Sequence, residues 1–220
     1  MDRPGTLTVK IEGLGILDDV KNQFLFAPQG IEKATDRALN HALKAVRAEG
    51  VRIAREKYTA KARAVRSRIK IRRVSIKNAR GEVFFSGKVG EPAGEFDIRP
   101  RRAPNWKGVN PRERKPAAGI LARFIRDGAF SAVEGPHGEK SFLAPFGGSG
   151  KLYVWYRRTS ERNGARKQVA DKGMRMLFGP SPIQALLSVD ARDRLAEYGQ
   201  DDFRKQLANQ VKLLFRKGVA

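Results

Sequence analysis

The fold is decided by the stretch Gly30–Arg73, which reads GIEKATDRALNHALKAVRAEGVRIAREKYTAKARAVRSRIKIRR. Within Ile31–Ile53, apolar side chains, many of them alanine, recur every three or four residues. This spacing is typical of one face of an α-helix. It predicts a long amphipathic helix of roughly 40 Å, in which Gly50 costs about 1 kcal/mol relative to alanine. Thr59 is a suitable N-cap for a second, short helix over residues 60–68.

Strands are predicted on both sides of this helical stretch. Residues 6–12 alternate between apolar and polar side chains, as a half-buried strand does. Residues 69–76 alternate apolar with mostly basic side chains, apart from one skipped step at Arg72–Arg73 that predicts a β-bulge, and residues 82–89 follow after a turn at 78–81. We therefore expect an antiparallel hairpin here, with Gly81 at a positive φ in its turn.

The second half of the chain carries further strand signals and one more long helix. Short β-forming runs, separated by turns that contain glycine, occupy residues 120–125, 130–134, 140–145 and 152–157. Ser181 is the expected N-cap of the final helix, with Pro182 in its first turn. Gly199 is expected to mark a kink or break in that helix.

These patterns together predict an α+β fold, in which a long N-terminal amphipathic helix and a C-terminal helix pack on a mostly antiparallel β-sheet with long basic loops. We expect one domain over residues 1–220. Residues 90–118 are rich in glycine, proline and arginine, and we predict that they form an extended basic loop or arm, with a short strand at Phe96–Arg99. A second basic loop is predicted at residues 158–173.

The net charge restricts the kinds of partner. The chain has 45 lysine and arginine residues against 23 aspartate and glutamate residues, which gives a formal charge of +22. Such a charge favours nucleic acid, an acidic membrane surface or an acidic protein. The longest apolar runs are only a few residues, against the ~20 that a membrane helix needs. We therefore expect a nucleic-acid partner or an acidic neighbour in an assembly, and no membrane.

The basic side chains predicted to contact a partner lie in two places. The larger group follows the long helix, in the segment 61–80, where nine lysine or arginine residues occur without an acidic one. The smaller group lies in the predicted loop. The alternative for every member is a solvated charge with no partner. The candidates are Lys61, Arg63, Arg66, Arg68, Arg72, Arg73, Arg101 and Arg102.

Residues with catalytic potential are sparse. The chain has no cysteine, and His41 and His137 are its only histidines. The run Gly147–Lys151 (GGSGK) resembles a phosphate-binding loop, but that motif requires glycine at position 145 and serine or threonine at 152. Pro145 and Leu152 occupy those positions. The sequence therefore predicts no enzymatic activity, no cofactor and no metal site.

Several short motifs, in the order in which they occur, resemble a phage protein family. They are Thr8–Leu14 (TVKIEGL), Tyr58–Lys61 (YTAK), Val65–Ile69 (VRSRI), Lys151–Arg157 (KLYVWYR) and Leu177–Ser181 (LFGPS). They extend over most of the chain. In this order they resemble the minor tail protein Z (tail completion protein) family of long-tailed phages and prophages.

This resemblance implies a structural component of the virion tail, assembled in the bacterial host cytoplasm. Such a protein would act late in tail assembly, at the head-proximal end, and would make the tail competent to join a filled head. Its implied partners are other tail or neck proteins and further copies of itself, in a ring. The basic surface has two uses under this reading, contact with acidic neighbours or with packaged DNA. The alternative from charge alone is a stand-alone basic nucleic-acid-binding protein.

Overall fold

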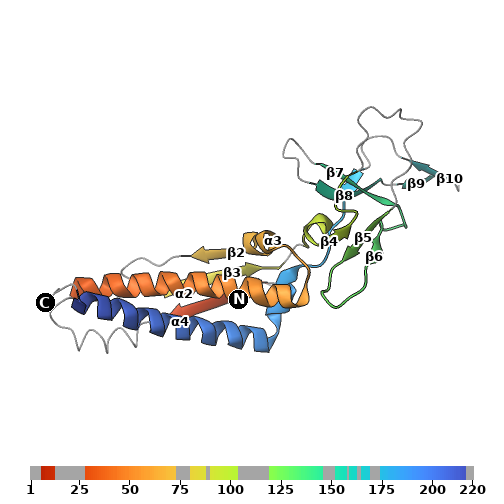
Figure 1. Cartoon of the computed structure of the whole chain (residues 1–220). Coiled ribbons are helices and arrows are strands. Elements are labelled where there is room, and N and C mark those ends of the chain that lie inside the picture. Colours follow the sequence, from red (N-terminus) through yellow and green to blue (C-terminus); the bar gives the residue numbers. More distant parts are fainter. Residues whose placement is uncertain are drawn as a thin grey trace. The chain divides into compact units, whose positions relative to one another are not determined.

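Figure 1 presents a computed structural model of the chain, which describes residues 6–12, 28–72, 80–87, 90–103, 119–145, 152–157, 159–162, 165–168 and 174–216. The chain divides into two compact units. Unit 1 comprises Met1–Ala54, Val65–Lys88 and Ile183–Ala220, and unit 2 comprises Arg55–Ala64 and Val89–Pro182. A division into two compact units does not show whether the chain unfolds in one cooperative step or in two. The single domain expected from the sequence therefore stays a prediction.

Unit 1 contains a three-stranded antiparallel sheet in the order β1-β3-β2. Its strands are β1 (Thr6–Glu12), β2 (Ile69–Arg72) and β3 (Arg80–Ser86). Phe85 of β3 pairs with Leu7 on one side and with Ile69 on the other, and all three side chains are buried. The alternation of apolar and polar residues therefore places one apolar face of this sheet in the core, as the sequence predicts.

Helix α2 (Pro28–Lys57) packs on that face at two glycines. A Cβ atom at Gly50 would lie 2.5 Å from Cε1 of Phe85, and one at Gly81 would lie 2.5 Å from Cδ1 of Leu43. The turn predicted at Gly81 is wrong, because Gly81 lies within β3 and pairs with Ile11. Both glycines serve the close approach of helix and sheet, which a side chain would prevent.

Helix α4 (Val189–Arg216) lies beside α2 (Figure 1) and is continuous through Gly199. Of the kink or break expected at Gly199, the break is wrong, because the helix runs from Val189 to Arg216; Gly199 is buried where α4 meets the rest of unit 1. A Cβ atom there would lie 2.7 Å from Cγ2 of Val46 and 3.0 Å from Cδ1 of Ile11. The α+β fold, with both long helices packed against the sheet, is confirmed.

The C-terminal helix begins later than its sequence predicts. Residues Pro182–Leu187 form a 3-10 helix (η3), and α4 follows at Val189. The hydroxyl of Ser188 accepts a hydrogen bond from the backbone N–H of Ala191 at 3.4 Å. Ser188 rather than Ser181 is therefore in the N-cap position of α4.

A buried carboxylate connects α2 to α4 inside unit 1. Glu49 has a side chain that is 6% exposed, and it accepts a hydrogen bond from Nε of Arg52 at 2.7 Å. Nε of Arg194 lies 3.1 Å from the same carboxylate. Two guanidinium groups therefore compensate the cost of burying Glu49.

Unit 2 consists mainly of short antiparallel strands. One three-stranded sheet has the order β4-β5-β6, a second has the order β11-β8-β7, and β9 pairs with β10. The strands of the first sheet are β4 (Asp97–Arg99), β5 (Ile120–Arg123) and β6 (Ser131–Val133). The others are β7 (Ser141–Pro145), β8 (Leu152–Arg157), β9 (Thr159–Arg162), β10 (Ala165–Gln168) and β11 (Met174–Met176). A β-hairpin thus occupies part of the basic loop predicted at 158–173.

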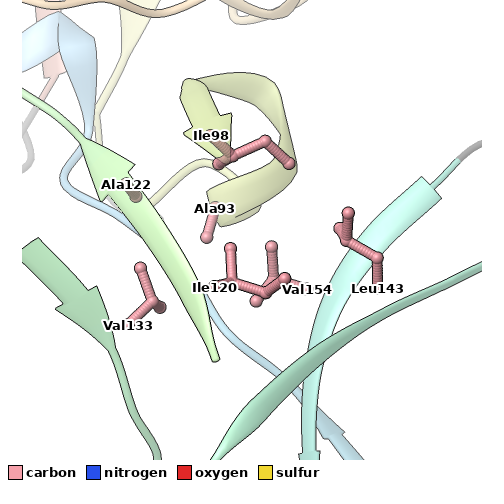
Figure 2. Packing of buried hydrophobic residues seen from close by; sticks show 7 residues of the cluster. All are labelled: Ala93, Ile98, Ile120, Ala122, Val133, Leu143 and Val154. Carbon is pink, nitrogen blue, oxygen red and sulfur yellow. The ribbon is translucent and has the colours of Figure 1, made fainter. Parts of the chain in front are cut away.

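The core of unit 2 is a cluster of small and branched apolar side chains, shown in Figure 2. Its members come from both three-stranded sheets and from the 3-10 helix η1 (Ala93–Glu95). They are Ala93, Ile98, Ile120, Ala122, Val133, Leu143 and Val154.

Part of the predicted basic arm at 90–118 belongs to this core. Ala93, Phe96 and Ile98 are buried, because η1 and β4 place them against the sheets. The strand expected at Phe96–Arg99 corresponds to β4, whereas the burial of Ala93 in η1 has no signal in the basic composition of the segment. Residues 104–118 lie outside the described part of the chain.

Candidate binding site

The segment Tyr58–Lys61 belongs to unit 2 and is held to the rest of that unit by hydrogen bonds. The N–H of Thr59 donates to the carbonyl of Phe124 at 2.9 Å, and the Thr59 hydroxyl donates to the carbonyl of Arg123. The N–H of Lys61 donates to the carbonyl of Glu95 at 2.8 Å. Tyr58 is 6% exposed. The start of the basic segment is therefore fixed against β5 and η1.

A pocket of about 910 Å³ opens beside this segment, entirely within unit 2. Its charged lining has five basic side chains and one acidic side chain: Lys61, Arg63, Arg101, Arg123, Arg126 and Asp97. The rest of the lining is apolar or neutral: Thr59, Gly94, Phe96, Ile98 and Leu152.

Asp97 is held by two of the pocket's arginines. Arg123, its cross-strand partner on β5, donates from Nη2 to Oδ2 at 2.9 Å. Arg101 donates from Nη2 to Oδ1 at 3.1 Å. Burial raises the pKa of the Asp97 carboxyl, but hydrogen bonds and positive charge from Arg101 and Arg123 outweigh burial and hold this pKa below its ordinary value of 3.8. Asp97 is therefore ionised at neutral pH.

A second carboxylate positions Lys61 and Arg63. Glu95 has a side chain that is 3% exposed, and its Oε2 lies 3.9 Å from Nζ of Lys61 and 3.4 Å from Nε of Arg63. Nζ of Lys61 also donates to the carbonyl of Gly94 at 2.8 Å. These contacts hold two cations at the pocket although both side chains are exposed.

The site keeps a positive charge after these pairings. Among the described residues, five cations line the pocket, and Asp97 and the adjacent Glu95 contribute two negative charges, so these seven groups carry a net charge of +3. Arg123 is further fixed by Phe130, whose ring centre lies 5.1 Å from its Cζ. Its Nε is buried and has no hydrogen-bond partner.

The predicted contact residues are divided between the two units. Lys61, Arg63 and Arg101 come together at the pocket, whereas the adjacent Arg102 is exposed and does not line it. Three more belong to unit 1: Arg66, Arg68 and Arg72. Arg73 lies outside the described residues. The contact role of the whole set stays a prediction.

Arg66, Arg68 and Arg72 already have contacts within unit 1. The carbonyl of Arg66 accepts from Nη2 of Arg47 at 3.0 Å, and the carbonyl of Arg68 accepts from the N–H of Ser86 at 3.1 Å. Nη1 of Arg72 lies 3.9 Å from the carboxylate of Glu82. The side chains of Arg66 and Arg72 are exposed, so their charges face solvent.

Sequence reasoning missed three charged residues of this pocket. Arg123 lies within the predicted strand 120–125 and Arg126 directly follows it, while Asp97 lies in the strand expected at residues 96–99, inside the predicted basic loop. Alternation along β5 could have placed Arg123 on the polar face. The pairing of β4 with β5, which sets Asp97 opposite Arg123, has no local signal.

Two searches of the described residues bear on other kinds of site. Among them, no group of three or more histidine, cysteine, aspartate or glutamate residues is placed to hold a metal ion. No helix in this part of the chain has the length and apolar character needed to cross a membrane. Comparison with protein-family models, with curated proteins and with solved structures found no match.

Asp97→Asn should make the free energy of unfolding of unit 2 depend less on pH in the acid range. A carboxyl whose pKa is lower in the folded state contributes stability above its unfolded pKa, and this contribution is lost as the pH falls through the folded pKa. At neutral pH we expect the variant to lose about 1–2 kcal/mol. The difference from wild type should shrink as the pH falls from about 5 to about 2.

Urea unfolding followed by tryptophan fluorescence measures this effect, because Trp106 and Trp155 both fall within the unit 2 range Val89–Pro182. The control is Asp127→Asn, which removes an exposed carboxylate and should change stability by less than about 0.5 kcal/mol. A loss for Asp97→Asn that stays the same at low pH would contradict the ion pairing described above.

Proposed function

We propose that this chain is a structural minor tail protein of a phage or prophage, which acts in tail completion and in joining the tail to the head. One observation supports this most strongly. Three of the motifs that carry the family resemblance each contact the segment of residues 91–95. The N–H of Lys61 donates to Glu95, the N–H of Gly179 donates to Glu91 at 2.8 Å, and Gly94 leaves room for the carbonyl of Leu152.

These contacts give the motifs a role in building the unit. A Cβ atom at Gly94 would lie 3.0 Å from the carbonyl oxygen of Leu152, and one at Gly179 would lie 2.5 Å from Cε1 of Phe124. The motifs YTAK, KLYVWYR and LFGPS therefore act together as determinants of one local fold. A family resemblance based on the order of several motifs requires that these motifs occur together. A shared role in one local fold imposes the same requirement.

Within this proposal the partners are other tail or neck proteins, together with further copies of this chain in a ring. The protein is located in the virion tail after assembly in the host cytoplasm. The basic pocket of unit 2 supplies a surface for an acidic neighbour or for packaged DNA. No enzymatic step is required.

Deletion of the gene from its prophage, followed by induction and electron microscopy of the lysate, tests this function. We expect filled heads beside unattached tails, and restoration of joined particles by the wild-type gene supplied in trans. Normal infectious particles from the deletion strain would refute the proposal.

The alternative is a stand-alone nucleic-acid-binding protein, which the charge of +22 favours. Binding of this kind is dominated by phosphate contacts, so the logarithm of the affinity should fall linearly with the logarithm of the salt concentration. Titration of labelled duplex DNA at several salt concentrations measures this slope. No binding at ~50 mM salt would exclude the alternative.

A further inference from the structure

The pocket of unit 2 combines two kinds of lining in a definite arrangement. Its apolar members Phe96 and Ile98 are 2% and 7% exposed, and Leu152 is half-buried. Lys61 and Arg101 have side chains that are 49% and 78% exposed. Of these three apolar members only Leu152 has appreciable accessible surface, and we call this surface the apolar floor; the exposed cations form the rim.

We propose that this pocket binds an acidic peptide segment of a partner protein, with carboxylates at the basic rim and an apolar side chain against the floor. The volume of about 910 Å³ exceeds what one side chain needs and lies within the range of about 300–1,000 Å³ found for ligand pockets. Several residues of an extended segment would fit.

The pocket already contains an example of the required carboxylate contact. Asp97 receives one guanidinium hydrogen bond on each of its oxygens, at 2.9 Å from Arg123 and 3.1 Å from Arg101. Charge-assisted bonds of this kind are stronger than neutral ones and have a defined direction. Because the described charged groups of the pocket, with Glu95 included, carry a net charge of +3, the site attracts further carboxylates.

The lining favours a peptide over a nucleic acid. Phosphate groups are bound by cations and by neutral hydrogen-bond donors, so the apolar surface of Leu152 would contribute little to their binding. Bases of a single strand bind by stacking on aromatic side chains. Phe96 is the one aromatic residue of the described lining, and at 2% exposed it offers no face for stacking.

This inference rests on the proposed function in one respect, namely that the occupant belongs to a protein neighbour. Two experiments distinguish a failure of this inference from a failure of the proposed function. A deletion phenotype without peptide binding would sustain the tail role and reject the pocket assignment. Peptide binding together with normal particles from the deletion strain would support the pocket assignment and reject the tail role.

The test uses the full chain and a fluorescein-labelled peptide of alternating glutamate and leucine, with fluorescence anisotropy read at ~0.15 M salt. Arg101→Ala and Arg102→Ala form a matched pair, because both residues are exposed, they are adjacent, and each change removes one positive charge. Only Arg101 lines the pocket. We expect Arg101→Ala to weaken peptide binding by about three- to tenfold and Arg102→Ala by less than about twofold.

Two further probes give the remaining outcomes. A peptide that alternates glutamate with serine should bind more weakly than the leucine peptide, because it lacks a group for the apolar floor. Equal effects of the two arginine variants, or equal affinity for the two peptides, would overturn the proposal. Tighter binding of duplex DNA than of the leucine peptide, reduced by Arg101→Ala but not by Arg102→Ala, would also overturn it, in favour of a phosphate site.

Discussion

Phe85→Ala is expected to lower the free energy of unfolding by about 3–5 kcal/mol, the usual cost of truncating a buried aromatic side chain. Phe85 is fully buried in the central strand of the unit 1 sheet, between Leu7 and Ile69. Its ring lies against α2 at Gly50. Removal of the ring therefore leaves a cavity between helix and sheet that neither can readily fill.

Urea unfolding followed by far-ultraviolet circular dichroism measures this loss, because α2 and α4 contribute most of their helical signal from unit 1. Phe215→Ala is the matched control, since Phe215 is 62% exposed and should cost less than about 1 kcal/mol. Equal losses for the two variants would show that Phe85 does not hold the position described.

The contact between Phe85 and Gly50 adds a sharper test of the same packing. In the wild-type background Gly50→Ala should destabilise, because the steric conflict at 2.5 Å outweighs the gain of about 1 kcal/mol in helix propensity. In the Phe85→Ala background that conflict is absent, so the same change should stabilise. Additive effects of the two substitutions would contradict direct contact.

The α+β class and the elements of unit 1 could be predicted from the sequence because their signals are local. The alternation over residues 6–12 and the helical period after Ile31 both arise from one buried face per element. Two predictions that rested on glycine residues were wrong. Gly81 and Gly199 suggested a turn and a helix break, whereas both allow close packing with residues distant in the sequence. Glycine alone does not distinguish conformational freedom from lack of space.

The pocket could be predicted only in part. The local density of charge, which is a property of the sequence, predicts Lys61, Arg63 and Arg101. Asp97 and Arg123 meet because β4 pairs with β5 in one register, and short strands of three or four residues carry too little alternation to fix it. The division of the basic residues between two units likewise depends on tertiary contacts.

Arg123→Glu should destabilise unit 2 by about 2–3 kcal/mol. The change places two carboxylates opposite each other across β4 and β5, where Asp97 is 18% exposed. It also removes the guanidinium that lies over Phe130. The expected loss is below the ~3–5 kcal/mol for breaking a fully buried ion pair, because the Arg123 side chain is 36% exposed and solvent screens part of the repulsion.

A control substitution separates this pairwise effect from the change in net charge. Arg126→Glu alters the charge by the same amount and lies at the same pocket. Nε of Arg126 donates a 3.0 Å hydrogen bond to the carbonyl of Arg55, at an exposed position. We expect a loss of no more than about 1 kcal/mol for this variant. Tryptophan fluorescence during urea unfolding reports both variants.

The decisive comparison is Asp97→Asn in two backgrounds. In the wild type it should destabilise at neutral pH, because Arg123 and Arg101 lose a carboxylate. In the Arg123→Glu background it should stabilise, because it removes one of two neighbouring negative charges. A change of sign requires that Asp97 and residue 123 interact directly. The same sign in both backgrounds would mean that the pair does not organise the charges of this pocket, and the proposed acidic-peptide site would then lose its structural basis.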